Sequence, residues 1–80
     1  MVNKSVSGTF EGKRRLLGVF LKELRINYGM TQQDLTNEYN IPRSVIQRIE
    51  RGDNINVETL FHITSALNIE LSQLFQMLDN

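Results

Sequence analysis

The stretch MTQQDLTNEYNIPRSVIQRIERG, residues 30–52, decides the fold, because it encodes two short helices joined by a short turn. Thr31 suits the N-cap of the first helix, and Asp34, three residues later, can complete a capping box with Asp in the place of Glu. Leu35 and Tyr39 are four residues apart, so we expect both to point inward from a helix of about nine residues.

The second helix of this stretch begins at Pro42 or Arg43 and ends at Arg51, with Gly52 as its C-cap. Pro42 cannot continue the preceding helix but suits the start of a new one. At about 100° per residue the helix divides into an apolar arc and a polar arc. The apolar arc holds Val45, Ile46 and Ile49, and the polar arc holds Arg43, Ser44, Gln47, Arg48 and Arg51. The polar arc is predicted to be exposed.

Upstream, an amphipathic pattern predicts a longer helix that begins near Thr9 or Gly12 and ends before Gly29. Its apolar stripe consists of Leu17, Phe20, Leu21, Leu24 and Tyr28.

Downstream, Asn56 can cap a helix over residues 57–67, which Asn68 ends, and residues 71–78 predict a fifth helix. The apolar stripe of the fifth helix consists of Leu71, Leu74, Phe75 and Leu78. No strand pattern or internal repeat occurs, so the predicted class is all-α, with about five short helices. We interpret residues 1–8 as a flexible N-terminal arm and residues 9–80 as a single domain.

Composition argues against several functional classes. The 80 residues contain no cysteine, so disulfides and thiolate metal sites are excluded, and His62 is the only histidine. We expect His62 to be a surface residue and predict no metal site and no cofactor. Neither a phosphate-binding glycine loop nor a catalytic Ser motif is present, so we do not expect an enzyme. No membrane-spanning run and no signal peptide are recognised, which makes the cytoplasm the expected location.

The zero net charge hides an asymmetry along the chain. Residues 1–51 hold nine basic and five acidic residues, a net charge of +4, and residues 52–80 hold four acidic residues and no Lys or Arg. This division suggests a polyanionic partner for the first part. A solvated polar surface with no such partner explains the charge alone equally well.

Glu50 lies on the border between the two arcs of the helix that ends at Arg51. A partly buried carboxylate there needs a cationic partner to be tolerated. Arg25, near the end of the first predicted helix, is the candidate. We therefore predict that Arg25 and Glu50 form a structural ion pair.

These features together resemble the helix-turn-helix of the lambda-repressor/Cro family, also called the XRE type. The resemblance spans roughly residues 13–76, includes the stretch VETLFHITSALNIELSQLF, and has a distinctive spacing across several helices. Its pattern rests on Met30, Thr31, Gln32, Leu35, Ile41, Ile46, Ile49, Glu50, Arg51 and Gly52.

The resemblance implies that the helix ending at Arg51 is a recognition helix, inserted in the DNA major groove. It implies base contacts by Arg43, Ser44, Gln47 and Arg48, and phosphate contacts by Thr31, Gln32 and Arg51. Pro42 departs from the pattern, because the family usually has a small polar residue there. The basic cluster Lys13, Arg14 and Arg15 is either in contact with the DNA backbone or simply solvated.

The implied function is a sequence-specific transcriptional regulator that binds a palindromic operator in double-stranded DNA as a homodimer, without contacting a membrane. Phe75, Met77 and Leu78 are the expected dimer interface, although closure of the core by Leu71, Leu74 and Phe75 is an alternative. A second hypothesis is an antitoxin-type module that binds a protein toxin as well as DNA. A third is a domain that keeps this fold without binding DNA.

Overall fold

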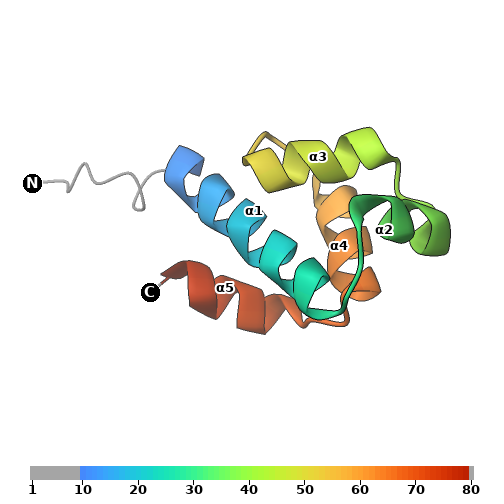
Figure 1. The fold of residues 1–80 in the computed structure, drawn as a ribbon. Coiled ribbons are helices and arrows are strands. Elements are labelled where there is room, and N and C mark those ends of the chain that lie inside the picture. The colour runs from blue at the N-terminus through green and yellow to red at the C-terminus, as the bar shows by residue number, and fades with distance from the viewer. Residues whose placement is uncertain (1–9, 80) are drawn as a thin grey trace, which may run out of the picture.

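A computed structural model describes residues 10–79, and within this range the protein consists of five helices and no strands. The predicted all-α class is therefore confirmed. The helices are α1 (Phe10–Asn27), α2 (Gln32–Tyr39), α3 (Arg43–Arg51), α4 (Val57–Ala66) and α5 (Leu71–Asp79). The N-terminal arm predicted for residues 1–8 lies outside the described residues. Figure 1 shows that α1 lies between α3 and α5.

The ends of α2 and α3 follow the local chemistry that the sequence predicted. The Thr31 Oγ1 accepts the backbone N–H of Asp34 at 3.0 Å, and the Asp34 Oδ2 accepts the N–H of Thr31 at 2.8 Å, which completes the capping box. Pro42 occupies the N-cap of α3 and provides no side-chain cap. Gly52 ends α3 with φ of 84°, a left-handed conformation that glycine adopts without a Cβ penalty.

Helix α4 is capped as expected, since the Asn56 Oδ1 accepts the N–H of Thr59 at 2.8 Å. Asn68 has a φ of 55° and follows the end of the helix. The helix itself ends at Ala66, one residue earlier than predicted, and α5 continues one residue further, to Asp79. Helix α2 has eight residues.

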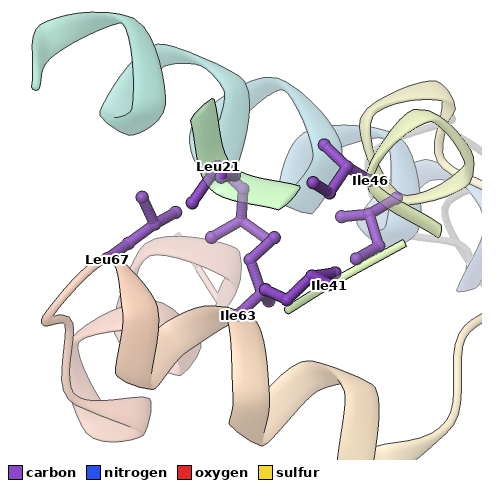
Figure 2. Packing of buried hydrophobic residues seen from close by; sticks show 7 residues of the cluster. Leu21, Ile41, Ile46, Ile63 and Leu67 are labelled. Atoms are coloured by element: carbon purple, nitrogen blue, oxygen red, sulfur yellow. The ribbon is translucent and has the colours of Figure 1, made fainter. Parts of the chain in front are cut away.

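The main core cluster is built from apolar side chains of α1 to α4 and of the segments that follow α2 and α4. Figure 2 shows Leu21, Ile41, Ile46, Ile63 and Leu67 converging, each no more than 2% exposed. Leu35 and Ile49 complete this cluster. Burying a side chain of this size stabilises the fold by about 1.5–3 kcal/mol relative to leaving it in water. Ile41 contributes from the turn between α2 and α3, so the turn is anchored in the core.

Two residues predicted to pack inward from α1 and α2 are in fact exposed. Tyr28 is 53% exposed because α1 ends at Asn27 and the following turn carries Tyr28 away from the apolar stripe. Tyr39 is the last residue of α2 and is 38% exposed. Ile41 in the turn is buried instead, which leaves Tyr39 at the surface.

The apolar surface of α4 and α5 is only partly covered. Val57, Phe61 and Phe75 are exposed, whereas Leu74 is fully buried. Phe75 therefore does not close the core, contrary to the alternative considered for it.

Within residues 10–79 no helix combines the length and apolar character that crossing a membrane requires.

Helices α1 and α3 approach closely where α1 has a glycine. A Cβ placed on Gly18 would lie 2.4 Å from the carbonyl oxygen of Ile49 and 2.9 Å from that of Glu50. Both atoms belong to the backbone, so the clash cannot be relieved by a side-chain rotation. The absence of a side chain at Gly18 therefore sets the distance between α1 and α3.

We predict that Gly18→Ala lowers the free energy of unfolding by about 1–3 kcal/mol, the usual cost of overpacking. The better helix propensity of alanine, about 1 kcal/mol, offsets only part of the clash. Chemical denaturation measures the change. The control is Val19→Ala on the exposed side of the same helix, expected to stay within about 0.5 kcal/mol of the wild type. Equal stability of Gly18→Ala and the wild type would show that α1 and α3 can separate at no cost.

Candidate nucleic-acid interface

The N-terminal part of α3 presents an open polar surface. Arg43, Ser44 and Gln47 are exposed, while Ile46 and Ile49 on the opposite side are buried. No hydrogen bond joins the side chains of Arg43, Ser44 or Gln47 to another residue within 10–79. The division into two arcs predicted from the sequence is thus realised, and these three polar side chains are available to an external partner.

The two arginines nearer the C-terminus of α3 are held by the loop that follows the helix. The Arg48 Nη2 donates to the carbonyl oxygen of Asn54 at 3.1 Å. The Arg51 Nη2 lies 2.7 Å from the Asp53 Oδ2, and both side chains are exposed to solvent. All three arginines of α3 therefore lie at the surface, but only Arg43 is unrestrained by partners within the described range.

Beneath this surface lies the pair that the sequence predicted between Arg25 and Glu50. The Arg25 Nε and Nη2 donate to the two carboxylate oxygens of Glu50 at 2.7 and 3.0 Å, a bidentate geometry. The two side chains are only 8% and 7% exposed. The Arg25 Nη1 also donates to the carbonyl oxygen of Met30 at 2.7 Å. The pair therefore joins the end of α1 to the end of α3 and to the residue that precedes the cap of α2.

Gln32 is bonded to the same carboxylate. Its Nε2 donates to the Glu50 Oε1 at 3.0 Å, so the first residue of α2 is also tied to α3. Gln32 lies in the first turn of α2, at the end of the helix where the backbone N–H groups are exposed. Thr31 is exposed beside them, with its hydroxyl engaged in the cap. Helix N-termini with unpaired N–H groups attract anions.

One cationic residue near this surface was missed by the sequence analysis. Lys22 of α1 lines a small pocket together with Gln32, Gln47, Glu50 and Arg51. Lys22 lies three residues before Arg25, hence about one turn away on α1. This spacing is visible in the sequence, but whether it brings Lys22 to the surface of α3 depends on how α1 crosses α3.

The basic cluster at the start of α1 is occupied by contacts within the protein. Lys13 lies 3.4 Å from Asp79 of α5, and Arg15 forms an ion pair with Glu11 at 2.8 Å. The Arg14 Nε donates to the carbonyl oxygen of Gly52 at 3.3 Å. Arg14 is therefore close to the C-terminal end of α3.

The described part of the chain contains no cluster of metal-ligating side chains. His62 is exposed, and no group of three His, Cys, Asp or Glu side chains within residues 10–79 gathers as metal ligands would. Phe75 is half exposed, and Met77 and Leu78 are partly buried on α5. These three residues lie on a different helix from the polar surface of α3.

These features define a helix-turn-helix DNA-binding protein. They are the helices α2 and α3 with their short turn, the buried Arg25–Glu50 ion pair, and the exposed surface of α3 that carries arginines. The helix-turn-helix family model matches residues 21–74, and the chain belongs to this family, in its XRE-type branch. The resemblance inferred from the sequence is confirmed. The protein is accordingly a DNA-binding transcriptional regulator. A comparison with curated proteins found no match.

Three solved structures of the restriction–modification controller protein C.Esp1396I are similar to this chain. The wild-type structure is 31% identical, covers 84% of this chain and 88% of its own, and has a TM-score of 0.71. A tyrosine-to-phenylalanine mutant is 31% identical with coverages of 84% and 86% and a TM-score of 0.72. The tetramer in complex with its natural 35 base-pair operator is 31% identical with coverages of 84% and 90% and a TM-score of 0.72.

We predict that Glu50→Gln lowers the free energy of unfolding by about 3 kcal/mol. The variant leaves the Arg25 cation buried without a counter-charge, and breaking a buried pair costs about 3–5 kcal/mol. Chemical denaturation of the two proteins measures the difference. The matched control is Glu23→Gln, an exposed carboxylate on α1, expected to change stability by no more than about 0.5 kcal/mol. A Glu50→Gln variant as stable as the control would contradict a structural role for the pair.

Proposed function

We propose that the protein binds a palindromic operator in double-stranded DNA as a homodimer and regulates transcription by occupying that site. The observation that carries the proposal is the exposed surface of α3, where Arg43, Ser44 and Gln47 are unrestrained and Arg48 and Arg51 lie beside them. Arg and Gln side chains can each bond a base edge with two hydrogen bonds, and the short Ser side chain permits close approach of the helix.

In this proposal the residues divide into two groups. Arg43 and Arg48 read bases in the major groove, assisted by Ser44 and Gln47, while Arg48 exchanges the carbonyl of Asn54 for a base. Contacts to phosphate position the protein without reading sequence. The residues assigned to phosphate are Thr31, Gln32, Arg51 and Lys22.

Dimerisation is supported by the symmetry that a major-groove reader needs. Two copies of α3 must reach half-sites about 34 Å apart, one turn of DNA, which a two-fold axis provides. The controller protein of similar structure is described as a tetramer with its operator. We assign the dimer interface to α5, where Phe75 is 49% exposed and Met77 and Leu78 are partly buried.

Selection from random DNA tests the proposal. The purified protein is mixed with random-sequence duplexes at about 150 mM salt, and the bound DNA is sequenced. An inverted repeat with half-sites about one helical turn apart is the expected result. Binding that disappears at this salt concentration and enriches no sequence would leave phosphate contact alone and contradict the proposal.

We predict that Arg43→Ala relaxes the preference at one base pair in each half-site. Loss of one bidentate contact removes about 1–3 kcal/mol of discrimination against the wrong base. The measurement is the affinity for the selected operator and for its single-base variants. A loss of equal size on every sequence would show that Arg43 touches only phosphate.

Gln32→Ala is expected to weaken binding to all duplexes by a similar factor and to leave the preferred sequence unchanged. The variant removes one phosphate contact as well as the bond to Glu50, so its stability is measured alongside its affinity. Asn37→Ala, a similar truncation of an exposed amide five residues further along α2, serves as the control. A changed base preference in Gln32→Ala would reassign Gln32 to base readout.

A further inference from the structure

The loop after α3 places a carboxylate directly on one of the arginines assigned to DNA. Arg51 is the last residue of α3, and Asp53 follows it after the left-handed Gly52. The Arg51 Nη2 and Asp53 Oδ2 are 2.7 Å apart. The backbone N–H of Asp53 donates to the carbonyl of Arg48 at 3.0 Å, so the helix end fixes the backbone from which this carboxylate extends.

The solvent exposure of the Arg51–Asp53 pair distinguishes it from the contacts of Glu50 and Arg48. The Arg51 and Asp53 side chains are 65% and 45% exposed, so neither is committed to the core. Glu50, by contrast, is buried and already accepts bonds from Arg25 and Gln32. Arg48 is restrained by a neutral carbonyl, which carries no net charge to compete with DNA.

A carboxylate in this position opposes DNA binding in two ways. It offers Arg51 an alternative to a phosphate oxygen, with the same charge and a similar geometry for the guanidinium. It also places a negative charge beside a surface that must approach a polyanion. An exposed pair of this kind contributes little to folding, so its energetic effect is on binding rather than on stability.

We propose that Asp53 competes with DNA phosphate for Arg51 and thereby lowers the affinity of the protein for DNA of every sequence. This inference rests on the proposed function and adds to it a residue that sets the strength of binding. Arg51 must break its ion pair with Asp53 to reach phosphate, so the contact between Arg51 and phosphate is weakened in each subunit. Weaker non-specific binding leaves more protein free to find its operator, because non-specific sites greatly outnumber operators.

The test is the affinity of Asp53→Asn for the selected operator and for a random-sequence duplex, measured over a range of salt concentrations. We expect binding to both duplexes to be stronger, by about two- to five-fold per subunit. The log–log salt dependence should steepen by no more than about 0.9 per subunit, because the variant completes a phosphate contact that the wild type forms only in part. Thermal denaturation should be nearly unchanged.

Two further variants separate competition for Arg51 from a change in net charge. Glu70→Gln removes an exposed carboxylate at the start of α5 and should leave DNA affinity nearly unchanged. In an Arg51→Ala background, the gain from Asp53→Asn should be much smaller, because only the general repulsion between the carboxylate and DNA remains. A gain of the same size without Arg51, or one that Glu70→Gln reproduces, would overturn the proposal, as would unchanged or weaker binding by Asp53→Asn. Failure of the wild-type protein to bind any duplex would instead overturn the proposed function.

Discussion

The orientation of α3 depends on one buried ion pair. Arg25 and Glu50 connect α1 to α3 through two hydrogen bonds, and Gln32 and the Met30 carbonyl attach the start of α2 to the same pair. Three helix ends therefore meet at one carboxylate and one guanidinium. Because both groups are desolvated, the loss of either leaves an unpaired charge in the interior, so the arrangement of the three helices is strongly specified.

The close packing of α1 against α3 allows this polar network to form. Gly18 permits the backbones to approach at Ile49 and Glu50, which brings Arg25 within reach of its partner. The core beneath supplies most of the stability, as expected for a short chain that can bury only a limited apolar surface. The consequence for function is that the polar arc of α3 faces solvent in a fixed orientation. Figure 1 shows α3 at the edge of the molecule, away from α5.

Most features that depend on local sequence were predictable, and most features that depend on the packing of distant segments were not. The cap at Thr31, the left-handed end at Gly52 and the two arcs of α3 follow from spacing and residue type. Tyr28 and Tyr39 were misplaced because each stands at a helix end, where the periodic pattern no longer fixes direction. The Arg25–Glu50 pair was found because a border carboxylate needs a partner. Lys22 and the bond from Gln32 to Glu50 were missed, since both require knowing how the helices cross.

The most direct test is to follow the arginine Nε–Hε resonances of isotope-labelled protein while the selected operator duplex is added. If α3 reads DNA while the buried pair holds it in place, the signals of Arg43, Arg48 and Arg51 shift and that of Arg25 stays where it was in the free protein. Unchanged signals of Arg43, Arg48 and Arg51, together with shifts confined to Arg14 and Arg15 of α1, would contradict the account and place the DNA on another surface.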